Sequence, residues 1–170
     1  TTGSGAATYE YDNAGDLVRE SRPDGTCMTF ERNESGSPVR IDRGGGRVTD
    51  MTYNDDGQVT RMTGPLDQIV NYGYDSSGNL VSQSDSAGES STTFDSSSRV
   101  VSKTDAAGAT THFSYDGDGN LTEVTNANGG NTRFAFDYMG NLLSETDQLG
   151  AVTTYTYDAA GRLVARLDRN

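Results

Sequence analysis

Apolar and polar positions alternate along this chain in short runs, and the runs are separated by glycine-containing turns. The most regular run is Phe113–Leu121, in which two rings flank a serine and an acidic, glycine-rich turn follows. Alternation with a period of two places every second side chain on one face of a β-strand. β-Branched and aromatic residues dominate these runs, and the segments between glycines are too short for helices. The pattern predicts an all-β protein with no helix.

The run is one copy of an internal repeat. A first column of rings, most of them followed by an acidic residue, recurs every 19 to 23 residues: Tyr11, Phe30, Tyr53, Tyr74, Phe94, Tyr115, Phe136 and Tyr157. A second column lies two positions earlier: Tyr9, Met28, Met51, Tyr72, Thr92, Phe113, Phe134 and Tyr155. The two columns hold 13 of the 14 aromatic residues, and Tyr138 alone lies outside them. The chain therefore consists of about eight copies of a unit of about 21 residues.

Glycines mark two turns in each copy. The first glycine follows the column ring by four residues: Gly15, Gly57, Gly78, Gly119, Gly140 and Gly161, with Ser98 in its place in one copy. The second follows the ring by 14 residues: Gly25, Gly44, Gly88, Gly108, Gly129 and Gly150, with Asp67 in the third copy. Asp-x-x-Gly is typical of a type I turn, in which aspartate caps the backbone and glycine takes the left-handed position. The second copy is irregular and is predicted to carry extra residues around Gly36–Pro38.

Each copy is therefore a predicted β-hairpin, and the chain an antiparallel meander of about 16 short strands. Strand twist accumulates across a long sheet, so we expect it to curl into a spiral or into part of a hollow β-shell. Residues 1–8 are predicted to be a flexible lead-in, and residues 9–170 the repeat domain. We see no end cap after the last copy, so we expect a segment of a larger shell.

Composition narrows the choice of partners. A formal charge of −12 leaves no basic patch for nucleic acid or for an anionic membrane. No apolar run approaches the length of a membrane span, so we expect no membrane insertion by this segment. Twelve of the 13 basic residues are arginines, which suit planar pairing with carboxylates or stacking on rings. Cys27 is the one cysteine, so the chain has no disulfide framework.

No group of residues has the spacing of a catalytic or metal site. His112 has no nucleophile or acid at a known spacing, and we interpret it as an exposed or cross-strand residue. Cys27 is interpreted as a small packed side chain. Asp116–Asn120 resembles the start of a helical calcium loop, but Leu121 and Ala127 occupy the sixth and twelfth positions, where glycine and glutamate are required. The acidic residues fill turn positions, so we predict no cofactor, no metal and no enzymatic activity.

The repeat resembles the YD repeat, whose consensus is close to YDxxGxLxxxxDxxGxxxxYxY. Tyr72–Leu80 and Tyr155–Leu163 both match it, and the resemblance extends from about Tyr9 to Asp168. Similar repeats form bacterial Rhs and wall-associated proteins, shell components of insecticidal toxin complexes, and the extracellular barrel of teneurins. The resemblance implies a hollow sheet that in bacteria encloses a toxic C-terminal segment. The self-cleaving DPxG segment of the Rhs core is missing, because no Asp-Pro pair occurs here.

These observations lead to one main hypothesis and two alternatives. The main hypothesis is a secreted or surface-displayed scaffold whose partners are an enclosed toxin polypeptide or neighbouring parts of the same larger chain. The first alternative is an extracellular adhesion module that binds glycans or cell-surface proteins through exposed turns or rings. The second is a unit that assembles edge to edge into a fibre.

Overall fold

The computed structural model describes residues 5–169, and these residues form one antiparallel sheet. The sheet has 16 strands, and their hydrogen-bonded order is their order in the sequence. The first eight strands are β1 (Thr8–Tyr11), β2 (Leu17–Ser21), β3 (Cys27–Arg32), β4 (Pro38–Asp42), β5 (Val48–Tyr53), β6 (Val59–Thr63), β7 (Ile69–Tyr74) and β8 (Leu80–Asp85). The remaining strands are β9 (Gly88–Phe94), β10 (Val100–Thr104), β11 (Thr110–Tyr115), β12 (Leu121–Thr125), β13 (Asn131–Phe136), β14 (Leu142–Thr146), β15 (Val152–Tyr157) and β16 (Leu163–Arg169). The predicted all-β meander of hairpins is confirmed.

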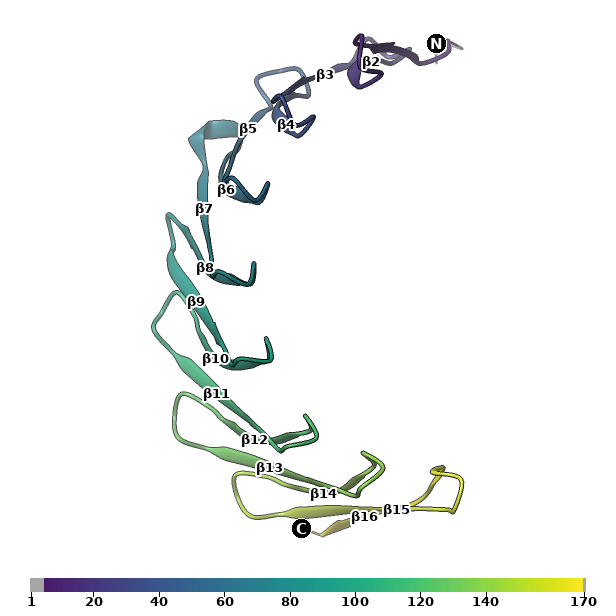
Figure 1. Cartoon of the computed structure of the whole chain (residues 1–170), viewed down its shortest axis with the longest axis vertical. Coiled ribbons are helices and arrows are strands. Elements are labelled where there is room, and N and C mark those ends of the chain that lie inside the picture. The colour runs from purple at the N-terminus through teal and green to yellow at the C-terminus, as the bar shows by residue number, and fades with distance from the viewer. Residues whose placement is uncertain (1–4, 170) are drawn as a thin grey trace. The chain divides into compact units, whose positions relative to one another are not determined.

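The described residues divide into two compact units. One contains residues 5–75 with 82–89, and the other contains residues 76–81 with 90–169. In the second unit, β11 to β16 are joined by hairpin turns at alternating ends (Figure 1). Of the predicted lead-in, residues 1–4 lie outside the described residues, and Thr8 already belongs to β1.

No α-helix occurs among residues 5–169. The one helical segment there is the 3₁₀ turn η1 (Pro65–Asp67), which joins β6 to β7. Leu66 and Asp67 have φ angles of 65° and 57° within it, so the segment is a left-handed loop rather than a regular helix. Asp67 thus adopts the left-handed conformation at the position where most other copies have glycine. No helix in the described part of the chain is long and apolar enough to cross a membrane.

Most of the hairpins contain a β-bulge beside a residue of the first column. In β11 and β12, Ser114 pairs with Glu123 but Tyr115 pairs with Leu121, so Thr122 is an extra residue on one strand. The same shift occurs at Tyr11, Tyr53, Phe136 and Tyr157. A bulge increases the local bend and twist of a strand. In Figure 1 the turns that close β11–β12, β13–β14 and β15–β16 accordingly bend out of line with their strands.

The second copy is regular, and the predicted extra residues around Gly36–Pro38 are wrong. Arg32 pairs with Pro38 after a bulge, as Tyr53 pairs with Val59 in the next copy. Asn33–Gly36 forms the turn, with the Gly36 N–H donating to the Asn33 carbonyl at 2.9 Å. Arg32 therefore occupies the first column, and Phe30 belongs to the second. The prediction is wrong because it takes the ring of Phe30 as the first-column residue, whereas the position of the turn sets the register of the strands.

With Arg32 in the column, the repeat length is nearly constant at 21 residues. The exception is the 20-residue step from Tyr74 to Phe94, where only Ser86 and Ala87 separate β8 from β9. The register also moves the second glycine of this copy from Gly44 to Gly46, although both have positive φ. The two columns still contain the same 13 rings.

None of the described residues is fully buried, although the rings in the middle of the chain are half-buried. The rings of the two columns share one face with the aliphatic residues, because Tyr115 is opposite Leu121 and Phe113 is opposite Val124. Contacts along the sheet therefore supply the stability that a closed core supplies in a globular domain.

Candidate functional site

The column tyrosines connect consecutive repeats through their hydroxyl groups. In four of the five first-column tyrosines, the hydroxyl donates to the backbone carbonyl 15 residues earlier, at the start of the previous copy's second strand. The bonds are Tyr53 to Pro38 at 2.7 Å, Tyr74 to Val59 at 2.9 Å, Tyr115 to Val100 at 2.9 Å and Tyr157 to Leu142 at 2.9 Å. Each of these carbonyls lies beside the bulge of the previous hairpin, and the hydroxyl supplies it with a side-chain donor. We call this set of bonds the tyrosine ladder.

Arg32 takes the tyrosine's place in the second copy. Its Nη2 donates to the Leu17 carbonyl at 3.4 Å, which is again 15 residues earlier, and its Nη1 donates to the Gly36 carbonyl at 3.0 Å. The guanidinium also lies 5.9 Å from the centroid of the Phe30 ring. An arginine can therefore replace a tyrosine in the ladder because both reach the carbonyl with a donor. Phe136 has no hydroxyl, and Tyr11 in β1 is 61% exposed.

The Asp-x-x-Gly turns are capped by the first side chain of the turn. Asp116 Oδ1 accepts hydrogen bonds from the N–H groups of Asp118 at 3.0 Å and Asn120 at 2.8 Å. The Gly119 N–H donates to the Asp116 carbonyl at 3.2 Å, and Gly119 has a φ of 92°. The other predicted first-turn glycines also have positive φ: Gly15, Gly57, Gly78, Gly140 and Gly161. Ser98 takes the same conformation with a φ of 58°.

Hydrogen bonds to these caps favour the ionised carboxylate. The Asn120 side-chain amide and then its backbone N–H lower the pKa of Asp116 below its usual value. Asn141 lowers the pKa of Asp137 in the same way, and Arg162 lowers that of Asp158. The acidic residues at these turns are therefore charged structural caps, in which the carboxylate oxygens already hold hydrogen bonds within the turn.

Successive first turns also lie against one another. A Cβ built on Gly140 would lie 3.8 Å from Asn120 Oδ1, and one on Gly161 would lie 3.8 Å from Asn141 Oδ1. At the preceding turn, Arg99 bridges two copies. Its Nε donates to Asp95 Oδ2 at 2.8 Å, its Nη1 donates to the Asp116 carbonyl at 3.3 Å, and its guanidinium lies 4.7 Å from the Tyr115 ring centroid.

The residues considered for catalysis belong to different strands and to different units. His112 is exposed in β11, opposite Ser102 on one side and Thr125 on the other. Cys27 is a free, half-buried cysteine at the start of β3, opposite Ser21. Within residues 5–169, no cluster of three or more His, Cys, Asp or Glu side chains could hold a metal ion.

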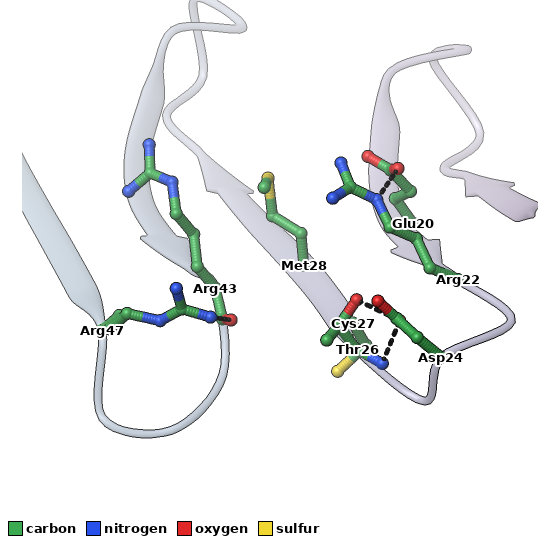
Figure 2. A pocket seen from close by; sticks show the side chains of 8 residues that line it. All are labelled: Glu20, Arg22, Asp24, Thr26, Cys27, Met28, Arg43 and Arg47. Carbon is green, nitrogen blue, oxygen red and sulfur yellow. Dashed lines mark hydrogen bonds and ion pairs between the residues drawn. The ribbon is translucent and has the colours of Figure 1, made fainter. Parts of the chain in front are cut away.

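A cavity of about 320 Å³ lies among β2, β3, the turn that joins them and the turn that joins β4 to β5 (Figure 2). Its charged lining includes Glu20, Arg22, Asp24, Arg43 and Arg47. Arg22 Nε pairs with Glu20 Oε1 at 2.7 Å, and this hydrogen bond raises the pKa of Arg22. Thr26 donates to Asp24 Oδ1 from its hydroxyl at 2.6 Å and from its backbone at 2.9 Å, which lowers the pKa of Asp24. Sequence reasoning missed this cavity.

A second, more open hollow of about 400 Å³ lies over the middle strands of the second unit. Its lining is rich in hydroxyl groups, including Ser114, Thr122 and Ser144, and contains the ion pair of Arg133 Nε with Glu123 Oε2 at 3.0 Å. The two charges neutralise each other, because Glu123 in β12 lies directly opposite Arg133 in β13.

The tyrosine ladder connects the hairpins, and capped turns close each of them. These features define the class of the protein as a structural shell scaffold built from repeats. The sequence model of the Teneurin YD-shell family matches residues 46–170, which is more than half of the chain. The chain belongs to this family.

Solved structures of toxin-complex proteins share the fold. One is a TcdB2–TccC3 complex, with a TM-score of 0.72 and 17% identity over 99% of this chain and 10% of that chain. Another is the Tc holotoxin pore of Photorhabdus luminescens, with a TM-score of 0.56 and 14% identity over 92% of this chain and 12% of that one. The chain therefore spans about a tenth of the length of these neighbours. A comparison with curated proteins finds no match.

Proposed function

We propose that this chain is a wall segment of a secreted or surface-displayed YD shell that encloses a toxic polypeptide and delivers it to a target cell. The observation that carries the proposal is the uninterrupted hydrogen-bonded order of 16 strands built from one repeated hairpin. Such a sheet can be extended by further hairpins, as a wall requires. The toxin-complex neighbours support the proposal through their shared fold.

The segment contributes shape and hydrogen bonds in this proposal, and chemistry belongs to the enclosed polypeptide. Turn caps and ladder bonds account for the aspartates, glycines and tyrosines that recur along the chain, which supports a scaffold without catalysis. A closed sheet would keep its cargo away from proteases and from the producing cell. Its partners would be the enclosed polypeptide and neighbouring parts of the same shell.

Cryo-electron microscopy of the full-length natural product tests the proposal. The expected result is a closed β-sheet wall, containing this segment, around density for a separate polypeptide. Limited proteolysis supplies a second readout, because the enclosed polypeptide should resist cleavage in the intact product and be cut when expressed alone. A solid, cavity-free sandwich, or equal cleavage in both forms, would contradict the proposal.

A further inference from the structure

The turns at the other end of the hairpins differ between copies in the residue that begins them. In the later copies this residue is Asp105, Asn126 or Asp147, and its Oδ1 accepts hydrogen bonds from two backbone N–H groups of the turn. In the first two copies the residue is arginine. Arg22 and Arg43 each form the same hairpin bond, to the carbonyls of Thr26 at 2.8 Å and Arg47 at 3.1 Å.

This exchange replaces a hydrogen-bond acceptor with a cation at two adjacent turns. Arg43 and Arg47 stand at the two ends of a turn made of Gly44–Gly46, whose φ angles are 73°, 64° and 79°. Among the described residues, the N–H groups of Gly45 and Gly46 have no acceptor, whereas the Ala107 N–H at the corresponding position of a later turn donates to Asp105. Asp42 Oδ1 accepts the Gly44 N–H at 2.7 Å, so the N–H groups of this turn that remain without an acceptor among residues 5–169 are those of Gly45 and Gly46.

The two arginines of this turn also lack an acidic partner. Arg43 Nη1 donates to Thr49 Oγ1 at 3.1 Å, while Arg47 donates to the carbonyls of Gly44 at 3.3 Å and Arg43 at 3.1 Å. No carboxylate among residues 5–169 forms an ion pair with either guanidinium. Each guanidinium has five N–H donors, so both retain donors after these bonds.

Both arginines line the cavity of about 320 Å³ described above. Figure 2 shows Arg43 and Arg47 on one side of it and the Glu20–Arg22 pair on the other, with Met28 between them. The carboxylates of the lining are already engaged, because Glu20 is bound to Arg22 and Asp24 to Thr26. Three arginines stand against the two carboxylates Glu20 and Asp24, so the lining has a net charge of +1 on a chain whose formal charge is −12.

We propose that the cavity beside Arg43 and Arg47 binds an oxyanion, either a carboxylate of an acidic polypeptide or a phosphate group. The oxyanion would replace the acceptor that Asp or Asn provides at the corresponding later turns. Planar guanidiniums bind such groups through paired, charge-assisted hydrogen bonds. Met28 gives the cavity an apolar wall against which the carbon chain of a glutamate can lie.

Nuclear magnetic resonance titration of the whole 170-residue chain tests this inference. Inorganic phosphate and the peptide triglutamate are added separately, and triglutamine serves as the uncharged control. We expect saturable shifts of the backbone and arginine Nε–H signals of residues 43–47 with at least one of the two anions. The affinity should fall at least about tenfold in R43Q/R47Q, the loss expected for about 1.4 kcal/mol of binding energy.

The matched control is R19Q/R61Q, which removes the same charge from two exposed arginines of the same unit that lie outside the cavity. This control should bind as the unmodified chain does, and R43K/R47K, which keeps the charge but not the planar fork, should bind at intermediate strength. Binding of phosphate alone identifies a free anion as the ligand, and binding of triglutamate alone identifies an acidic polypeptide. Absence of saturable shifts with both anions, or equal losses in R43Q/R47Q and R19Q/R61Q, would overturn the inference.

Discussion

A single oxygen atom distinguishes the two ring types of the first column. Tyrosine and phenylalanine both cover the apolar face, but only tyrosine reaches the carbonyl of the previous copy. In the ladder, Tyr115 does so at 2.9 Å, whereas Tyr155 in the second column has no such bond among the described residues. The hydroxyl is therefore expected to add stability only in the first column.

Tyr115→Phe should lower the free energy of unfolding by about 1 kcal/mol, because it leaves the Val100 carbonyl without its donor. Urea unfolding followed by circular dichroism measures the change. Tyr155→Phe is the control, since it removes the same atom from a half-buried ring in the same unit, and it should change stability by clearly less. Equal effects of the two substitutions would show that the ladder bond contributes nothing.

The turn caps should make stability depend on pH. The folded pKa values of Asp116, Asp137 and Asp158 are lowered by hydrogen bonds, so each group stabilises the fold above its unfolded pKa of about 3.9. That contribution is lost as the pH falls through the folded value. Unfolding free energies should therefore drop between about pH 5 and pH 2.

Replacing all three caps by asparagine should flatten this acid-induced loss, because an amide does not titrate but can still cap, as Asn33 and Asn126 do. Urea unfolding at several pH values provides the comparison. Asp118→Asn is the control, because this exposed side chain caps no backbone group in its turn. A triple variant that keeps the full loss at low pH would disprove the role assigned to the caps.

At the scale of the element, the hairpin depends on one left-handed residue in each first turn. Most copies use glycine there, and Ser98 adopts a φ of 58° at some cost. An L-residue in this region is strained by about 1–2 kcal/mol, whereas glycine is not. The turn can therefore form with a residue other than glycine, but at a cost in stability.

Ser98→Gly should raise the free energy of unfolding by up to about 1 kcal/mol, because glycine adopts this conformation without strain. The loss of the 3.3 Å hydrogen bond between Asn79 Nδ2 and the serine hydroxyl will offset part of this gain.

Gly119→Ala should lower the free energy of unfolding by about 1–2 kcal/mol, because the φ of Gly119 is 92° although there is space for a Cβ. Gly117→Ala in the same turn is the control. Its φ is not left-handed, nothing lies within 4 Å of the added atom, and no loss is expected. Thermal unfolding measures all three variants.

At the scale of the whole molecule, the end strands are less covered than the middle ones. In β1, Tyr9 and Tyr11 are 53% and 61% exposed, and in β16, Leu163, Val164 and Leu167 are 55%, 60% and 51% exposed. Each end strand also has only one neighbour in the strand order. Unpaired edges with apolar side chains favour pairing with another chain.

The isolated 170-residue chain should therefore associate as its concentration rises, and V164K/L167K should weaken this association. Sedimentation velocity at several concentrations measures the effect. A160K/A159K adds the same charge at the exposed turn before β16 and should associate like the unmodified chain. If the unmodified chain sediments as a monomer at every concentration, the edges do not pair.

The sequence alone determined the β-hairpin, its two turns and the near-constant repeat length, because strand alternation and turn chemistry are local properties. Local chemistry also explains why the sequence alone assigns Asp116 and Gly119 to a turn. The position of Arg32 could not be found in this way. Its place in the column follows from the register of β3 with β4 and from a bond to Leu17 in another hairpin.

The tyrosine ladder and the cationic cavity likewise depend on tertiary structure. Tyr115 and Val100 are 15 residues apart, and the sequence pattern carries no signal that distinguishes a ring that only packs from one that also donates. Arg22 and Arg43 are 21 residues apart, one repeat length, and only the stacking of hairpins brings their turns to the same cavity. The repeated residues thus set the hairpin, while the contacts between hairpins decide which side chains meet.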